Sequence, residues 1–236
     1  MKKPQSLVTF ITDDLEEKIL NGTLKPGQRL LEAELCRTYD ISQTPLREAL
    51  RILESQGYVT HEPRKGVFVT KITINDIEEI YRLRANLESL ATYLAIKNNN
   101  PEVLANLKKM HQQMINAATQ KDVKAYVALN LKFHEIIITA SQSKRLIQML
   151  QTFIKQTERF RLNILMNPEM FKSSIDAHEN VIRLFESGDA EKAEKMRKKS
   201  ILKNVGTYIK KMKGKDITAV MSKTDKKEIN CGLIPK

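Results

Sequence analysis

The chain contains only two cysteines, Cys36 and Cys231, among 236 residues. They lie far apart and in no spacing typical of metal ligands, which argues against a disulfide scaffold and against a zinc knuckle. No apolar run approaches the length needed to cross a bilayer, and the N-terminus becomes acidic and helical where a signal peptide would be apolar. We therefore expect a soluble cytoplasmic protein with no membrane partner.

The sequence also lacks the short motifs that carry catalysis in many enzymes. It has no glycine-rich phosphate loop, no HExxH pair and no nucleophile elbow. Its nine methionines are typical of gap-filling core or surface positions. We therefore expect no enzyme and no tightly held cofactor.

Positive charge is in excess, but it is unevenly placed. The chain has 40 Lys and Arg against 28 Asp and Glu, and residues 1–71 hold only 11 basic and 10 acidic side chains. The excess therefore lies in the remainder, where a Lys-rich surface that serves solubility explains it as well as a polyanionic partner does. Nucleic-acid binding has to be argued from the residue pattern instead.

The first 72 residues predict three helices. The first helix is expected over residues 6–20 and the second over 31–39, with apolar residues spaced as on one buried face. Thr44 can cap a third helix, with Pro45 at its first position and Gly57 as its natural stop. Two β-prone segments, 58–61 and 67–70, then flank a basic tip, which indicates a hairpin. The order is that of a winged helix-turn-helix.

A helix-turn-helix places the N-terminal side chains of its second helix in the major groove of DNA. Small polar groups there approach phosphate or base edges, and a forked arginine suits guanine or phosphate. The glycine at the hairpin tip lets the backbone pass close to the sugar-phosphate chain. The expected DNA-binding residues are Ser42, Gln43, Thr44 and Arg47 on the helix, and Arg64, Lys65 and Gly66 on the wing.

The stretch ILNGTLKPGQRLLEAELCRTYDISQTPLREALRILESQGYVTHEPRKGVFV resembles the DNA-binding domain of the GntR superfamily of bacterial regulators. The match covers the glycine and proline positions, the start of the third helix and the wing. The family more often has arginine where this chain has Gln43. Arginine pairs best with guanine and glutamine with adenine, so we hypothesise an A·T pair at the corresponding operator position. Gln43 touching only phosphate is the alternative.

From residue 75 the pattern changes to long helices, which predicts an all-α six-helix bundle. The domains expected are a winged helix-turn-helix over 1–72, a helical domain over 73–214 and a flexible basic tail over 215–236. The fold class is therefore mostly α. The six helices are expected over 75–98, 101–119, 121–140, 143–166, 168–187 and 189–213.

From YRLRANLESLATYLA onward this second domain resembles the FCD effector domain of the FadR-type branch, in its shorter, VanR-like form. In that family an Asp-x3-His pair and two later histidines hold a divalent metal that helps to bind a small carboxylate. The matching positions here are Asn130, His134, His178 and Ser200. Because Asn lacks the charge of Asp and neutral Ser is a poor ligand, we expect no tightly bound metal, or at most a degraded site at His134 and His178.

Three roles remain open for the two histidines: core residues, hydrogen-bonding groups in a polar ligand pocket, or a weak metal site. We favour the pocket, lined by Asn130, His134, His178 and Ser200. Arg84 matches a family arginine that could bind an organic acid directly, and an ion pair with Glu88 one turn later is its alternative role. Arg159 and Arg161 are weaker candidate cations.

Together these patterns predict a ligand-responsive bacterial transcription regulator, and more specifically a repressor. It would bind a palindromic operator in double-stranded DNA as a homodimer and release it when a small organic acid binds. An architectural DNA-binding dimer whose second domain senses nothing is the alternative.

Overall fold

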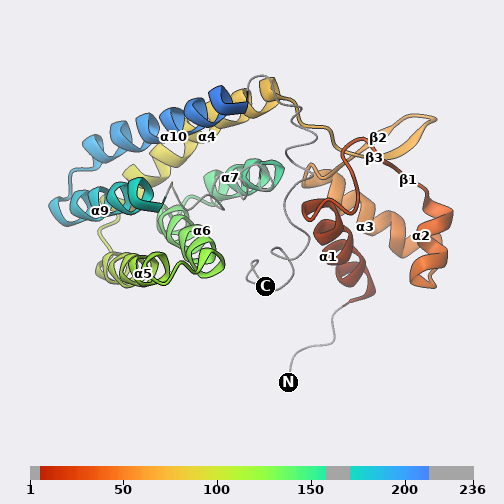
Figure 1. Ribbon diagram of the computed structural model, residues 1–236, viewed down its shortest axis with the longest axis horizontal. Coiled ribbons are helices and arrows are strands. Elements are labelled where there is room, and N and C mark those ends of the chain that lie inside the picture. Colours follow the sequence, from red (N-terminus) through yellow and green to blue (C-terminus); the bar gives the residue numbers. More distant parts are fainter. Residues whose placement is uncertain (1–5, 158–170, 213–236) are drawn as a thin grey trace. The chain divides into compact units, whose positions relative to one another are not determined.

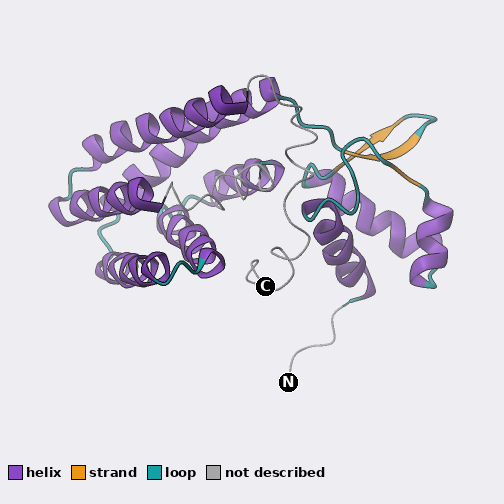
Figure 2. Ribbon diagram, viewed as in Figure 1, coloured by secondary structure: helices purple, strands orange, loops and turns teal. Residues whose placement is uncertain are grey.

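The computed structural model describes residues 6–157 and 171–212, so the tail over 215–236 lies outside the described residues. The chain divides into two compact units, one extending through Thr73 and one beginning at Ile74. Helices dominate both units, and the strands of the described ranges form one small sheet in the first unit (Figures 1 and 2). This architecture confirms the mostly α fold with an N-terminal winged helix-turn-helix.

Three helices build the first unit: α1 (Leu7–Leu20), α2 (Glu32–Tyr39) and α3 (Gln43–Ser55). The hydroxyl of Ser6 accepts a hydrogen bond from the amide of Thr9 at 3.1 Å and so satisfies one open donor at the start of α1. Asp40 ends α2 in the left-handed conformation, with φ of 52°. This reversal turns the chain toward α3 within two residues, as a helix-turn-helix requires.

The predicted start of α3 was wrong by two residues. The N-cap is Ser42, and the helix begins at Gln43, so Thr44 lies inside it and Pro45 occupies its third position. A proline is tolerated there because the amides of the first turn have no partner within the helix. The end is as predicted, since Gly57 follows the last turn with φ of 81°.

The wing is a three-stranded antiparallel sheet in the order β1-β3-β2, formed by β1 (Arg29–Leu30), β2 (Val59–Glu62) and β3 (Gly66–Val69). The predicted hairpin is confirmed, with Glu62 paired to Gly66 at its closed end. β1 was not predicted, because it is only two residues long; it pairs with β3.

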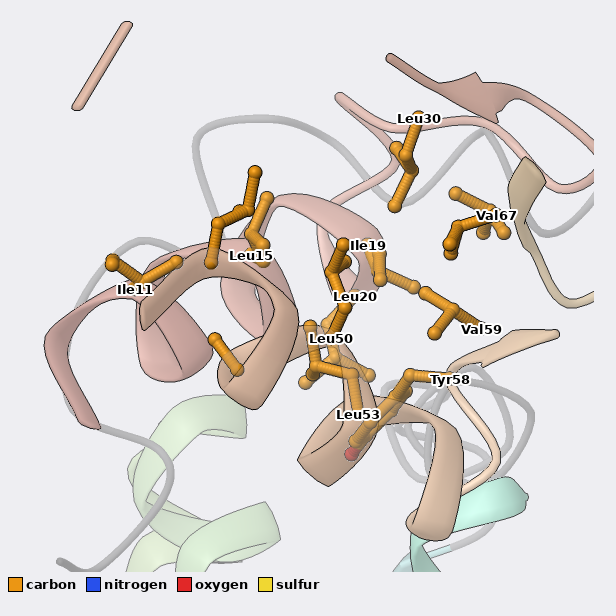
Figure 3. Close-up of a cluster of buried hydrophobic side chains, with 13 residues drawn as sticks. Ile11, Leu15, Ile19, Leu20, Leu30, Leu50, Leu53, Tyr58, Val59 and Val67 are labelled. Carbon is orange, nitrogen blue, oxygen red and sulfur yellow. The ribbon is translucent and has the colours of Figure 1, made fainter. Parts of the chain in front are cut away.

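The core of the first unit lies where α1 and α3 meet the sheet (Figure 3). Leu15 and Leu53 are fully buried there, and each such side chain contributes about 1.5–3 kcal/mol relative to an exposed one. The sheet adds its inward-facing residues, since Val67 and Val69 alternate with more exposed neighbours on β3. This packing fixes the orientation of α3 and leaves its opposite face to solvent.

The second unit contains six described helices. Asn100 and Asp122 cap α5 and α6 by accepting backbone amide hydrogen bonds. The predicted helix over 143–166 is shorter than expected, because it ends at Gln156, and residues 158–166 lie outside the described ranges. The helices are α4 (Ile74–Lys97), α5 (Pro101–Thr119), α6 (Val123–Ala140), α7 (Lys144–Gln156), α9 (Phe171–Ser187) and α10 (Ala190–Met212).

In Figure 1, α10 runs alongside α4 over much of its length, and Lys97 near the end of α4 contacts Glu191 at the start of α10. The two helices are therefore antiparallel. An apolar cluster lies between α5, α6 and α9, with Phe133 and Leu107 fully buried. No helix within 6–157 and 171–212 has both the length and the apolar character to cross a membrane.

Candidate functional site

The N-terminal part of α3 presents the polar residues that the sequence predicted as DNA contacts. Ser42, Gln43, Thr44 and Arg47 are all exposed. Leu46 lies among them in sequence but is fully buried, because it belongs to the stripe that packs against α1. The first turns of α3 thus pack against α1 on one side and present exposed polar side chains, which DNA could contact, on the other.

Arg47 is held by a residue of the neighbouring helix. Its Nε donates to Oε2 of Glu32, the first residue of α2, at 2.8 Å. This hydrogen bond, together with the charge of Glu32, raises the pKa of Arg47 above its usual value. Arg47, which was predicted to contact DNA, is therefore oriented by the carboxylate of Glu32, fifteen residues earlier in the chain.

The wing tip is basic and sharply turned. Arg64 and Gly66 have φ of 64° and 108°, and Arg64 and Lys65 are exposed. Lys65 pairs with Glu62 at 3.0 Å, which offsets part of the local charge. Arg29 of β1 supplies a further cation, because its Nε lies only 3.4 Å from where a Cβ on Gly66 would stand. Sequence reasoning missed Arg29, since nothing predicted the short strand that carries it to the wing.

A buried polar cluster lies inside the second unit, centred on Glu88 of α4. Arg84 donates to its Oε1 from both Nε and Nη2, at 3.0 and 2.7 Å, and Nη1 of Arg84 reaches the hydroxyl of Thr157 at 2.8 Å. Arg197 of α10 donates to its Oε2 at 2.5 Å. Burial alone would raise the pKa of Glu88, but the two guanidiniums outweigh it and lower the pKa to about 2. Glu88 is therefore ionised at neutral pH.

The same Arg197 joins the cluster to the two histidines. Its Nη2 lies 3.2 Å from Nδ1 of His134, and Nε2 of His134 lies 3.2 Å from Nε2 of His178. An arginine only donates, so Nδ1 of His134 accepts and the hydrogen of that neutral ring is on Nε2. His134 then donates to Nε2 of His178, which leaves the hydrogen of His178 on Nδ1. The geometry therefore assigns both tautomers.

Nδ1 of His178 is buried and has no hydrogen-bond partner among the described residues. The side chain is only 3% exposed. Burial, with smaller contributions from Arg197 and His111, lowers the pKa of His178 to about 3, so the ring is neutral. The chain of hydrogen bonds from Glu88 through Arg197 and His134 thus ends at the Nδ1–H group of His178, which has no acceptor among the described residues. A buried donor without an acceptor destabilises the fold unless a ligand or a water molecule accepts from it.

Asn130 lies one turn before His134 and belongs to the same contact between helices. Its Nδ2 donates to the hydroxyl of Ser174 at 3.2 Å, and the Tyr126 ring stacks on Phe171 with centroids 3.8 Å apart. The α6–α9 ladder, as we call it, thus has three successive rungs: Tyr126–Phe171, Asn130–Ser174 and His134–His178.

Ser200 is half-buried on α10, and no hydrogen bond joins it to the histidines in the described part of the chain. The residue that reaches His134 from α10 is instead Arg197, one turn earlier. Of the two roles considered for Arg84, the structure has the ion pair with Glu88, at 2.7 Å. Arg159 and Arg161 lie outside the described residues.

These side chains do not fit the divalent metal that an FCD domain implies. A metal needs imidazole lone pairs, but Nδ1 of His134 accepts from Arg197 and Nε2 of His178 accepts from His134. The guanidinium adds positive charge at the place where a cation would have to sit. No three His, Cys, Asp or Glu side chains of residues 6–157 and 171–212 are grouped so as to hold a metal ion.

Comparison with known proteins assigns both units to families. The FCD domain model matches residues 79–201, and the model of bacterial regulatory proteins of the gntR family matches residues 7–69. The HTH-type transcriptional regulator YdhC of Bacillus subtilis is 34% identical over 152 residues, which cover 64% of this chain and 68% of that protein. The gluconate operon transcriptional repressor of Bacillus licheniformis is 27% identical over 183 residues, 75% of this chain and 74% of that one.

A solved structure of McbR (YncC) from Escherichia coli superposes with a TM-score of 0.69 and 25% identity, covering 87% of this chain and 98% of that chain. In sequence, the regulator McbR is 31% identical over 149 residues, 63% of this chain and 67% of its own. In this chain the match to the gntR family precedes the match to the FCD domain, as the helix-turn-helix with its wing precedes the helical unit. The chain belongs to the GntR family of bacterial transcription regulators and carries an FCD domain.

Proposed function

We propose that this regulator is a ligand-responsive repressor that binds a palindromic operator as a homodimer and releases it when a small carboxylate binds in its FCD domain. The observation that carries the sensing part is the buried, unpartnered Nδ1–H of His178. A sensor differs from an architectural dimer in having such an incomplete site, which a ligand can complete.

The charge of the cluster favours an anion. It contains two guanidiniums, Arg84 and Arg197, against the single carboxylate of Glu88, while the tautomer assignment leaves both histidines neutral. A ligand that brings one negative charge and an acceptor oxygen would therefore balance the charge and satisfy the donor of His178. A divalent metal would do neither. We accordingly propose direct, metal-free binding of an organic acid.

Of the predicted ligand residues, His178 is the direct donor in this proposal and His134 fixes its tautomer. Asn130 and Ser200 lie one turn from His134 and from Arg197, where they would line the same site. Arg84 contributes charge, and it can contact a ligand only by giving up Thr157 or part of its bond to Glu88. One relative is named as a repressor of a gluconate operon, and gluconate is itself a hydroxycarboxylate, which supports both repression and this ligand class.

The homodimer is supported by apolar side chains that the second unit leaves exposed. Leu83 and Leu90 of α4 are 44% and 40% exposed, and their spacing of seven places them on the same face of the helix. A second copy of the chain packed on this face would bury Leu83 and Leu90 and would join two winged helix-turn-helix domains in one dimer. Two half-site contacts then reinforce each other through their effective concentration.

Two measurements on the full chain test the proposal. Wild-type protein is first used to select a binding sequence from a randomised DNA duplex library, and enrichment of an inverted repeat is expected. A panel of mono-, hydroxy- and dicarboxylates, each beside its neutral amide, is then tested for thermal stabilisation of the protein and for release of the selected duplex.

A sensor should be stabilised by at least one carboxylate and not by its amide, and the same compound should release DNA, since it must favour the DNA-free state. Palindrome binding with no response to any carboxylate would support the architectural dimer instead. Stoichiometric zinc or nickel in the purified protein would contradict metal-free binding.

A further inference from the structure

Glu32 is an unexpected residue to find beside a DNA-reading surface. It is acidic, partly exposed and placed at the first position of α2, where phosphates of bound DNA would repel it. The first 71 residues carry almost balanced charge, so an acidic side chain here is not offset by a large basic excess. Its position next to Arg47 therefore calls for a specific role.

The contact with Arg47 uses only one of its nitrogen atoms. Glu32 Oε2 accepts from Nε at 2.8 Å, and neither Nη1 nor Nη2 of Arg47 has a partner among the described residues. The Arg47 side chain is 59% exposed, so these two nitrogens are open to solvent. Because the guanidinium is planar, fixing Nε also fixes the direction of the outer edge that Nη1 and Nη2 share.

That outer edge is a two-donor fork. Its two N–H groups match the O6 and N7 acceptors of one guanine, or two oxygens of one phosphate. An unrestrained arginine of this exposure would sample many rotamers and would meet either kind of acceptor. A restrained one keeps its fork in one direction relative to α3, and so favours the acceptor pair at one position of the groove.

We propose that Glu32 is a positioning residue for sequence recognition: its carboxylate holds Arg47 by Nε and so aims the free Nη1/Nη2 fork at a single base pair. This inference rests on the proposed operator binding. Glu32 would then have two effects. Its negative charge lowers the affinity for any DNA, and its contact with Arg47 raises the ratio of specific to non-specific affinity.

Glu34 provides a matched control two residues later on α2. It is exposed, carries the same charge near the same helix start, and its carboxylate accepts no hydrogen bond within the described ranges. Full-length wild type, Glu32→Ala, Glu32→Gln and Glu34→Ala are compared for binding to the selected duplex and to a scrambled duplex of equal length and composition. Equal melting temperatures of the four proteins establish that the fold is intact.

Glu34→Ala should raise both affinities by similar factors and leave their ratio unchanged, because it removes only charge. Glu32→Ala should raise the affinity for the scrambled duplex similarly but lower the ratio by roughly five- to tenfold, within the range that one forked base contact supplies. Glu32→Gln keeps an acceptor for Nε without the charge, and should recover most of the ratio. In an Arg47→Lys background, Glu32→Ala should no longer change the ratio.

Equal ratios for Glu32→Ala and Glu34→Ala, in a protein whose wild type selects a sequence normally, overturn this inference alone. Failure of the wild type to select any sequence overturns the proposed operator binding and this inference with it. A loss of affinity for both duplexes with Glu32→Ala would show a purely structural role and would also overturn it.

Discussion

His134 donates a hydrogen bond from Nε2 to Nε2 of His178, and this single contact leaves the second ring with a buried hydrogen on Nδ1 that no described atom accepts. Both rings are neutral: His134 has both nitrogens engaged by neighbours, whereas His178 has only Nε2 engaged. The pair thus differs from a metal site, because it has a buried donor without an acceptor and no free lone pair.

Two substitutions of His178 separate its two nitrogens. His178→Gln keeps an acceptor near the Nε2 position, so His134 retains a partner, but it removes the donor at Nδ1. His178→Asn keeps a donor near Nδ1 and removes the outer acceptor. We expect the Gln variant to lose stabilisation by carboxylates and the Asn variant to retain part of it, as measured by thermal shift. Equal responses of the two variants would contradict the role of the Nδ1–H group.

The same residue predicts a dependence of stability on acidity. The pKa of His178 is about 3 in the folded chain, against about 6.5 for an unfolded histidine. Between these values the unfolded state binds a proton that the folded state does not. The free energy of unfolding should therefore fall as the pH drops below about 6.5, by up to about 1.4 kcal/mol per pH unit.

Glu88 should lower the free energy of unfolding further at more acidic pH. Its pKa falls from 4.5 to about 2 in the folded chain, so below pH 4.5 the unfolded state binds a proton that the folded state does not. Urea unfolding of wild type and His178→Gln between pH 7 and pH 5 measures the histidine contribution alone. The free energy of unfolding of the variant should change less with pH than that of the wild type. Parallel slopes would show that another group dominates in this range.

Arg197 can be compared with a surface arginine of similar geometry. Arg197→Met removes the hydrogen bond to Glu88 and leaves Nδ1 of His134 without that donor, which should lower the free energy of unfolding by about 1–3 kcal/mol. Arg183 pairs with Glu179 at 2.6 Å, but both side chains are well exposed. Arg183→Met should therefore cost less than about 1 kcal/mol. Equal costs in urea unfolding would show that the buried network adds nothing.

Two glycines predict opposite effects of one added methyl group. Gly66 has φ of 108°, which a side chain disfavours, so Gly66→Ala should destabilise the first unit by about 1–2 kcal/mol and weaken DNA binding through the wing. Gly206 lies inside α10, and a Cβ there meets nothing within 4 Å. Gly206→Ala should stabilise the protein by up to about 1 kcal/mol. Thermal unfolding checks both signs, and the same sign for both would refute the argument.

Gln43 predicts a base preference. Gln43→Arg should shift the preferred base pair from A·T to G·C at one position of each half-site, because the forked guanidinium matches guanine while the amide matches adenine. The measurement is binding of wild type and variant to duplexes that differ only at that position. Indifference of the wild type to A·T against G·C would mean that Gln43 contacts phosphate alone.

Apolar periodicity was sufficient to predict where most helices lie, because each helix buries one face and its spacing is visible locally. Leu46, Ala49, Leu50 and Leu53 mark the buried face of α3 in the sequence and in the structure. The end of α7 could not be predicted in this way. Apolar residues continue in the sequence beyond it, but the helix ends at Gln156, and the hydroxyl of the next residue, Thr157, accepts a hydrogen bond from Arg84, 73 residues earlier.

The polar site was harder to predict, because its contacts connect residues far apart. The histidines and Arg84 could be singled out by family spacing, but Arg197 lies in the lysine-rich run EKMRKKS and resembles a solvated cation. Only the packing of α10 on α4 shows that this side chain turns inward to Glu88. The contact between Glu32 and Arg47 is likewise invisible to local pattern, since it joins two helices across a turn.

The α6–α9 ladder limits the kinds of motion by which a ligand can act. Each rung pairs a different chemistry, so the two helices cannot slide past each other by a whole turn without mismatching every rung. A shift of α9 by one turn would set His134 against Ser174 or against Ile182, and the imidazole pair would be lost. A ligand that acted through this unit would therefore have to tilt or rotate α6 and α9 by less than one helical turn, so that the three paired contacts are kept.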